Sequence, residues 1–126
     1  MSTRANILLV EMGNHLWMYH HWDGYPSWLG KKLMEKMEKH QKDYADIFDI
    51  ANEFIKDKDD DAYEITPRRH GDIEYLYVIN ITDRSIECIK TSFSTEYDDK
   101  NLLKVQYNET EDIKKWYDFC KKDEVE

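Results

Sequence analysis

The sequence is poor in cysteine and has no long apolar run. Its two cysteines, Cys88 and Cys120, form no Cys-x-x-Cys pair and show no spacing typical of a metal site. Reduced thiols in a cytoplasmic protein are the ordinary interpretation of this pattern. The apolar run at residues 7–10 is far too short for a signal peptide or a membrane span. We therefore predict a cytoplasmic protein that does not enter a membrane.

Positive charge is also scarce. The chain has 18 Lys and Arg against 27 Asp and Glu, a net charge of −9. Nonspecific binding to nucleic acid depends on cations that neutralise phosphates, so we do not expect such binding here. The acidity is compatible with a basic protein partner, with mimicry of a nucleic-acid surface, or simply with solubility.

Catalytic and cofactor motifs are missing as well. The sequence contains no Gly-x-Ser-x-Gly nucleophile motif, no P-loop and no Gly-x-Gly-x-x-Gly dinucleotide motif, and neither cysteine is next to a histidine. These absences favour a protein that is not an enzyme, and we predict no cofactor.

Aromatic and turn-forming residues are concentrated in residues 19–30, which read Tyr-His-His-Trp-Asp-Gly-Tyr-Pro-Ser-Trp-Leu-Gly. A pattern with a period of two stops in this segment and a helical pattern begins. We expect the segment to form a corner shared by several elements of a single domain that spans residues 1–126. The apolar content of 40% is enough for a core at this length.

Residues 3–10 and 15–22 alternate in the manner of two β-strands. Gly13-Asn14 lies between them and is a favourable hairpin turn, because both residues tolerate positive φ. A turn centred there sets four cross-strand pairs: Val10 with Trp17, Leu8 with Tyr19, Asn6 with His21, and Arg4 with Asp23. The face that should cover the core carries Ala5, Ile7, Leu9, Leu16, Met18, His20 and Trp22. We predict that Trp22 is largely buried and that Trp17 is at least partly buried.

Recurring apolar residues predict two helices, over about residues 28–41 and 44–56; a single long helix is the alternative. Ser27 and Asp43 are suitable N-caps for them. Thr110 is expected to cap a closing helix. The apolar stripe of that helix consists of Ile113, Trp116, Tyr117 and Cys120.

The second half of the chain is expected to supply more strands. Residues 63–72 contain Pro67 and Gly71 and should form a loop, or a short edge strand followed by a turn. Residues 73–81 are apolar on both faces, which is typical of a central strand, and residues 85–93 and 102–107 follow. The order ββαα-βββ-α predicts an α+β domain in which an antiparallel sheet of four to five strands has helices packed on one face.

Polar side chains collect at the open end of the predicted hairpin, on the face away from the core: Arg4, Asn6, Tyr19, His21 and Asp23. Arg4 has a planar donor fork suited to phosphate or carboxylate, and the imidazole of His21 can act as a donor, an acceptor or an acid–base group. The group is therefore a candidate site for an anion or a nucleotide. The alternative is a strut, in which Arg4 pairs with Asp23 and His21 bonds the following turn.

A metal site is not predicted. Strand alternation sends His20 and His21 to opposite faces. Only His21 and Asp23 then remain together, whereas catalytic zinc generally needs three protein ligands.

Arg68-Arg69-His70-Gly71 is the one dense basic segment of this acidic chain. Cations in a glycine-containing loop suit phosphate, so Arg68, Arg69 and His70 are further candidate ligand-binding residues. A solvated loop that balances the neighbouring aspartates is the alternative. A fold in which this loop covers the hairpin corner would favour both candidate sites.

Part of the chain resembles a known group of sequences. The segments are Thr3-Arg4-Ala5-Asn6-Ile7, Tyr19-His20-His21-Trp22-Asp23-Gly24-Tyr25-Pro26 and Leu29-Gly30. They resemble a family of small, mostly uncharacterised phage and prophage proteins that carry a Thr-Arg dipeptide before a strand and a Tyr-x-His-Trp-Asp-Gly-Tyr-Pro segment. The match covers the first quarter of the chain and, later, a strand of the Tyr-Leu-Tyr-x-Ile type at residues 75–79. The resemblance implies a phage setting, in which small accessory proteins often bind host or rival machinery, immune systems included.

Two functions therefore compete. One is a phage accessory protein that binds a host or rival protein in the host cytoplasm and inhibits a defence system, as anti-CRISPR proteins do. The other is a nucleotide- or anion-binding protein, a sponge or a small enzyme, that uses Arg4, His21 and Asp23. A structural or assembly role is a third alternative. The sequence makes no prediction of oligomeric state.

Overall fold

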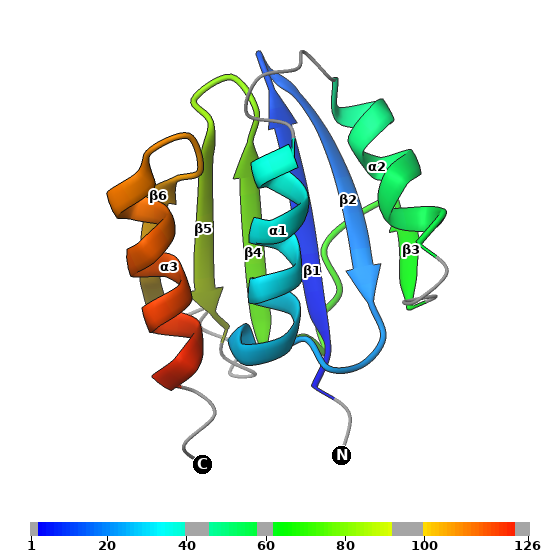
Figure 1. The fold of residues 1–126 in the computed structure, drawn as a ribbon. Coiled ribbons are helices and arrows are strands. Elements are labelled where there is room, and N and C mark those ends of the chain that lie inside the picture. Colours follow the sequence, from blue (N-terminus) through cyan, green and yellow to red (C-terminus); the bar gives the residue numbers. More distant parts are fainter. Residues whose placement is uncertain (1–2, 40–45, 58–61, 92–99, 123–126) are drawn as a thin grey trace.

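The computed structural model describes residues 3–39, 46–57, 62–91 and 100–122, which form a β-sheet with helices on one face (Figure 1). The strands are β1 (Ala5–Glu11), β2 (Asn14–His20), β3 (Tyr63–Thr66), β4 (Tyr75–Asn80), β5 (Ser85–Lys90) and β6 (Lys100–Gln106). The helices are the π-helix η1 (Pro26–Gly30), α1 (Lys31–Lys39), α2 (Ile47–Ile55) and α3 (Thr110–Lys122). The predicted α+β class is confirmed.

The sheet has six strands in the order β3-β2-β1-β4-β5-β6. Strands β1 and β4 run parallel and all other neighbours run antiparallel, so the prediction of four to five antiparallel strands is wrong. Residues 67–74 carry the chain from β3, at one edge, across β2 and β1 to β4. A crossover between parallel strands usually takes a dozen or more residues and contains a helix. Because residues 67–74 are so few and contain no helix, the sequence shows no pattern that would predict this parallel connection.

The β1–β2 hairpin turns at Met12-Gly13, one residue earlier than predicted. Both residues have positive φ, 44° and 87°, as the favoured type I′ hairpin turn requires. Trp17 consequently lies opposite Leu8 rather than Val10, and the other three predicted pairs are wrong as well. Each partner moves by two residues. Because side chains alternate with a period of two, every residue of the hairpin keeps its predicted face.

Trp22 is 44% exposed, so the prediction that it is buried is wrong. Strand β2 ends at His20, and Asp23 adopts a left-handed conformation with φ of 53°. The chain thus leaves the sheet before Trp22 can extend the core face. Trp17 is partly buried, as predicted.

Gly24 fixes the turn after β2 to the sheet. Its N–H donates to the carbonyl of Thr3 at 2.8 Å, and its own carbonyl accepts the hydroxyl of Tyr77 at 2.7 Å. A Cβ at this position would lie 2.8 Å from the Cβ of Ala5. Only glycine lets the turn pack this closely.

The first helical segment begins at Pro26, next to the predicted cap Ser27. The capping position belongs to Tyr25, and no side chain caps the helix there, so the assignment to Ser27 is wrong. Proline suits a first helical position because no N–H is needed there. The π-helix η1 leads directly into α1, and the indole N–H of Trp116 donates to the Gly30 carbonyl at the junction, at 2.8 Å.

Helix α2 begins at Ile47 and is capped by Asp46, whose carboxylate accepts the N–H of Asp49 at 2.9 Å. The helix thus begins three residues after the predicted start at about residue 44, and both that position and the predicted cap, Asp43, lie outside the described residues. The closing helix α3 begins at Thr110. Its apolar stripe is as predicted, with Trp116 and Cys120 buried and Ile113 and Tyr117 partly buried.

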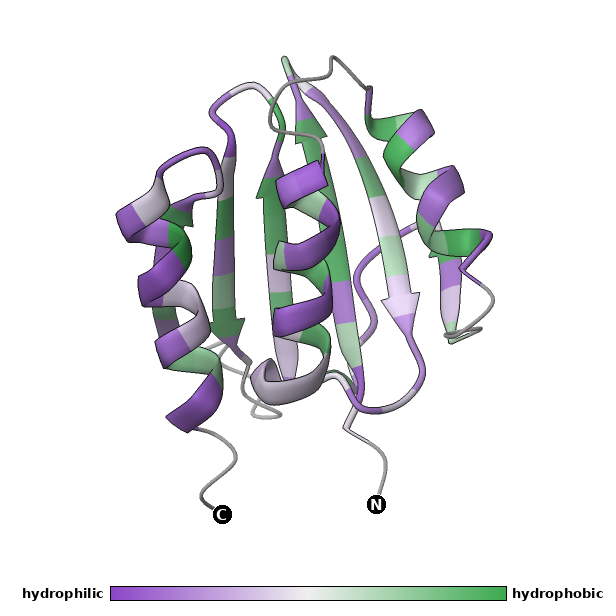
Figure 2. Cartoon of the chain, viewed as in Figure 1, coloured by the Kyte–Doolittle hydropathy of each residue, from purple (hydrophilic) through white to green (hydrophobic). Residues whose placement is uncertain are grey.

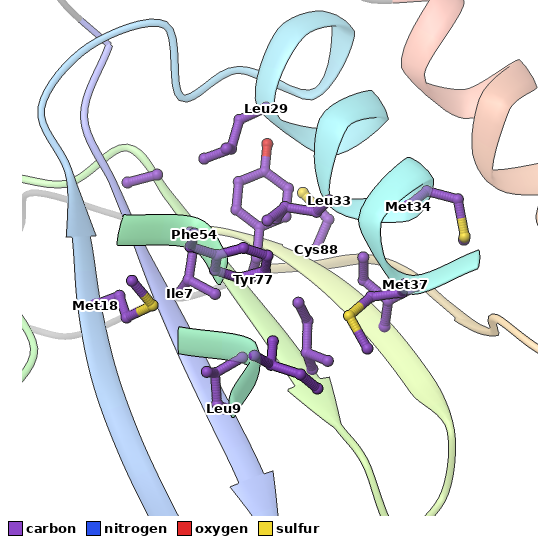
Figure 3. Close-up of a cluster of buried hydrophobic side chains, with 14 of the residues drawn as sticks. Ile7, Leu9, Met18, Leu29, Leu33, Met34, Met37, Phe54, Tyr77 and Cys88 are labelled. Atoms are coloured by element: carbon purple, nitrogen blue, oxygen red, sulfur yellow. The ribbon is translucent and has the colours of Figure 1, made fainter. Parts of the chain in front are cut away.

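The main core lies between the helices and the sheet. Figure 3 shows some of its side chains, among them Ile7, Leu9, Met18, Leu33, Met37, Phe54, Tyr77 and Cys88. Hydrophilic residues predominate on the outer side of α1 and α3 (Figure 2). Among the described residues, no helix is long and apolar enough to cross a membrane.

A smaller apolar cluster occupies the other face of the sheet. Its buried members are Tyr19, Ile73 and Leu76, and Leu8, Trp17, Val78 and Ile89 pack partly buried against them. Residues 67–74 run across one end of this face. They place the basic segment of the sequence beside the hairpin.

Candidate functional site

The loop after β3 folds over the open end of the hairpin. The ring of His70 stacks on Tyr19, with centroids 4.1 Å apart and planes at 24°. The backbone N–H of His70 donates to the side-chain oxygen of Asn6 at 2.8 Å. The two candidate sites of the sequence therefore meet at His70. The arginines of the same loop lie beside it, Arg68 exposed and Arg69 partly buried.

Asp72 joins the polar groups of this corner. Its Oδ2 lies 3.3 Å from Nη1 of Arg4 and accepts the Tyr19 hydroxyl at 3.0 Å, and its Oδ1 lies 3.8 Å from Nδ1 of His70. The side chains of Arg4 and Asp72 are each 47% exposed. Water screens such a pair, so it orients the loop more than it stabilises the fold. Asp72 was not predicted, although a carboxylate two residues after His70 was an available partner for Arg4.

His21 extends the cluster to the edge strand. Its Nε2 lies 2.9 Å from Oε2 of Glu64, and its ring lies edge-on to Tyr19 with centroids 4.7 Å apart. Glu64 stands opposite Tyr19 in the β2–β3 ladder, so both side chains project from the same face. Glu64 was missed because the sequence did not show that β3 pairs with β2. The described partner of His21 is thus Glu64, and the expected bond from His21 to the following turn is not what the structure shows.

Asn6 is a structural member of the corner. It is fully buried, its Nδ2 donates to the Met18 carbonyl at 2.7 Å, and its Oδ1 accepts the N–H of His70. With both ends of the amide bonded, Asn6 fixes the loop to the sheet. Asp23 lies in the turn after β2. The carboxylate that pairs with Arg4 comes from the loop instead.

Tyr19 is the buried centre of the cluster. Burial first, and then the hydrogen bond to Asp72, together raise the pKa of Tyr19 to about 12. The hydroxyl therefore stays protonated near neutral pH and acts as a donor. It orients the Asp72 carboxylate, which in turn holds Arg4. The arrangement is suited to recognition by fixed charges and hydrogen bonds.

Six exposed or partly exposed side chains lie at this corner, and we call them the corner surface: Arg4, His21, Trp22, Glu64, His70 and Asp72. Trp22 lies next to His21, with ring centroids 6.3 Å apart. In the part of the chain that the structure describes, no three His, Cys, Asp or Glu side chains come together in a group that could hold a metal ion.

A hollow of about 540 Å³ lies between α1 and α2, on the helical side of the molecule. Its lining is charged throughout: Lys32, Glu35, Lys36, Lys39, Glu53, Lys56 and Asp57. Nζ of Lys36 pairs with Oδ2 of Asp57 at 2.7 Å. The four lysines and three carboxylates almost balance, so the hollow has little preference for an anion or a cation.

The chain matches no family model, no curated protein and no solved structure. Residues 3–30 supply Arg4, His21 and Trp22 of the corner surface, and residues 64–72 supply Glu64, His70 and Asp72. The geometry of this surface is the basis of the function proposed below.

Proposed function

We propose that the protein acts by binding another protein through the corner surface, and that this binding inhibits a host defence system. One observation carries the proposal. Arg4 pairs with Asp72 and His21 pairs with Glu64, while these four side chains stay between 44% and 56% exposed. The surface therefore presents polar groups that are already oriented by their partners. A partner can use them without first paying to order them.

The aromatic side chains of the corner fit the same purpose. Tyr19 and His70 stack to form the base of the surface, and Trp22, which lies next to His21, is 44% exposed. Tryptophan, tyrosine and arginine are the residues that most often carry the binding energy of protein interfaces. The exposed indole of Trp22 is therefore the expected anchor.

The same pairing weighs against an anion site at Arg4, His21 and Asp23. A phosphate that used the guanidinium of Arg4 would compete with Asp72, and it would meet the carboxylate of Glu64 beside His21. Both carboxylates repel an anion. Capture of a nucleotide is accordingly the weaker proposal. It predicts that a nucleotide at a hundred times its Kd stabilises the folded protein by about 2.7 kcal/mol and so raises its melting temperature. A protein-binding surface predicts no change in melting temperature with any free nucleotide.

The inhibitory role is supported by the resemblance of residues 3–30 to phage accessory proteins and by the net charge of −9. An acidic binder favours a partner whose functional surface is basic, because complementary charge speeds and orients association. Surfaces that bind nucleic acid in defence complexes have this character. Occupying such a surface would block its normal ligand.

The proposal is tested by recovering the partner from bacterial cells with the tagged protein as bait. His21→Asn is compared with His15→Asn, a matched control because both histidines are exposed, His15 on β2 and His21 directly after its end. We expect one stoichiometric partner with the wild type and with His15→Asn, and its loss with His21→Asn at unchanged thermal stability. Retention of the partner by His21→Asn, or no stoichiometric partner at all, would contradict the proposal. Inhibition is scored by whether expression of the protein restores phage plating on cells that carry a defence system.

A further inference from the structure

We propose that the edge formed by β3 and α2 is a second binding site, which captures an extended cationic segment of a partner protein by adding it as a strand beside β3. The inference rests on the proposed function only in taking the partner to be a protein. Its residues differ from those of the corner surface, apart from Glu64, which belongs to both.

The outer side of β3 is a template for another strand. Among the described residues, β3 is the last strand at its end of the sheet, and it pairs with β2 on its inner side. The carbonyl of Ala62 accepts the N–H of His21 at 3.2 Å, so the backbone of Ala62 faces β2. Backbone groups alternate in direction along a strand. The N–H and C=O of Ile65 therefore point away from β2, where an added strand can bond to them.

Three large apolar side chains are exposed along this edge. Ile65 on β3 is 52% exposed, and Phe48 and Ile55 on α2 are 60% and 43% exposed. We call these three residues the edge patch. Scattered exposed hydrophobic residues are ordinary, but these three lie on adjoining elements. Helix α2 packs against β3, where Phe54 stacks on Tyr63 with centroids 5.3 Å apart.

The position of the α2 side chains follows from helix geometry. Phe48 and Ile55 are seven residues apart, about two turns, and so share one flank of the helix. Glu53 and Asp57, from the opposite flank and the end of the helix, line the hollow against α1. Phe48 and Ile55 therefore face away from α1. Figure 1 shows α1 over the middle of the sheet and α2 toward its β3 end, so this flank faces the β3 edge of the molecule.

The other edge of the sheet is protected in ways that β3 is not. Strand β6 carries Lys100 and Lys104, both exposed, and lysines on an edge discourage pairing. The N–H of Tyr107 donates to the carbonyl of Arg84, just before β5, at 2.8 Å. The N–H of Gln106 therefore points outward, where the carboxylate of Asp112 accepts it at 2.9 Å. β3 has an exposed isoleucine in place of a lysine. The contrast marks β3 as the edge available for pairing.

Charge identifies the occupant. Residues 46–57 and 62–66, which form α2 with its ends and β3, contain five acidic residues and one lysine. Glu53 and Asp57 line the hollow toward α1, whereas Glu64 is exposed on β3 itself. A strand with alternating side chains would lay apolar residues on the edge patch and turn the others toward Glu64, on the opposite face. Lysine or arginine at these positions would meet the Glu64 carboxylate. A second copy of the chain is the less favoured occupant, because it would bring its own Glu64 and net charge of −9 to the same edge.

The test uses a fluorescent ten-residue peptide of alternating Val and Lys, with a peptide of alternating Val and Glu as its charge control. Ile65→Pro removes the outward N–H and leaves the β2 ladder intact, and Ile65→Val is the matched control that keeps it. We expect anisotropy to show binding of the Val-Lys peptide, at least tenfold weaker binding of the Val-Glu peptide, and at least a tenfold loss with Ile65→Pro. Ile65→Val should stay within twofold of wild type, and the Ile65 amide should exchange more slowly when peptide is bound.

Three results would overturn the inference: no binding of the Val-Lys peptide, binding that Ile65→Pro leaves unchanged, or a dimer of the free protein that Ile65→Pro dissociates. The last result would make a second copy the occupant. Circular dichroism checks that Ile65→Pro is folded, and Ile65→Lys is the substitute if it is not. Failure here is distinct from failure of the corner proposal, which shows as retention of the cellular partner by His21→Asn.

Discussion

The imidazole of His70 stacks on the phenol of Tyr19, 4.1 Å away, although the two residues are far apart in sequence. This contact joins the loop after β3 to the hairpin and places Asp72 within reach of Arg4. The corner surface therefore depends on the crossing of residues 67–74 over β2 and β1. The predictions below test the crossing, the turn that supports it and the surface that it completes.

Asp72→Asn should separate recognition from stability. The pair with Arg4 is half exposed, and such pairs contribute about 0–1 kcal/mol. Asparagine can still accept the Tyr19 hydroxyl. We expect the free energy of unfolding in urea to change by about 1 kcal/mol or less, together with loss of the cellular partner. A larger loss of stability would show that Asp72 is mainly a structural strut.

Gly24→Ala should be strongly destabilising. The added Cβ would lie 2.8 Å from the Cβ of Ala5 and 3.0 Å from the carbonyl oxygen of Thr3, and overpacking of this kind costs about 1–3 kcal/mol. Gly71→Ala is the matched control, because nothing lies within 4 Å of its added Cβ. We expect Gly71→Ala to stay within about 1 kcal/mol of wild type. Equal effects of the two changes on urea unfolding would contradict the close packing of Gly24 on β1.

The tryptophans should divide into structural and surface residues. Trp116 is fully buried, and Trp116→Ala should cost about 3–5 kcal/mol. Trp22 is 44% exposed, so Trp22→Ala should cost about 1 kcal/mol or less. Denaturant unfolding followed by circular dichroism measures both. A cost for Trp22→Ala close to that for Trp116→Ala would place Trp22 in the core after all.

Because of Tyr19, we expect the free energy of unfolding to fall at alkaline pH. Its pKa rises from the ordinary 10.0 to about 12 in the folded protein, chiefly because of burial. Folding therefore favours the protonated phenol. Its contribution to stability is complete below pH 10 and is lost as the pH rises from 10 toward about 12. Wild type should lose more stability over this range than Tyr19→Phe, measured by urea unfolding at each pH. Parallel pH profiles would show that the Tyr19 hydroxyl is not buried.

The sequence predicted the elements of this fold better than their connections. The faces of β1 and β2 were predicted correctly even though the turn was misplaced, because a two-residue shift preserves alternation. The burial of Trp22 was predicted wrongly because β2 ends at His20 and the chain turns away at Asp23, where φ is 53°. The parallel pairing of β1 with β4 left no signal in the composition of the connecting loop.

The candidate site shows the same division. Arg4, Tyr19, His21 and His70 were chosen from local pattern, and the structure brings them together. Glu64 and Asp72 were missed because they reach the hairpin only through the β2–β3 pairing and the crossing loop. Neither relationship is local in sequence. Asp23 was chosen from a register that placed it opposite Arg4, and that register is wrong.

Photo-crosslinking in living cells tests the central claim, that the corner surface binds a protein, most directly. A photoreactive phenylalanine analogue is placed at Trp22 in one variant and at Met12 in the other, at the opposite end of the hairpin. Met12 is 81% exposed against 44% for Trp22, so random encounters would favour crosslinks from position 12. We predict a single strong adduct from position 22, abolished by Asp72→Asn, and none from position 12. An adduct from position 12 of equal or greater strength, or none from position 22, would contradict the account.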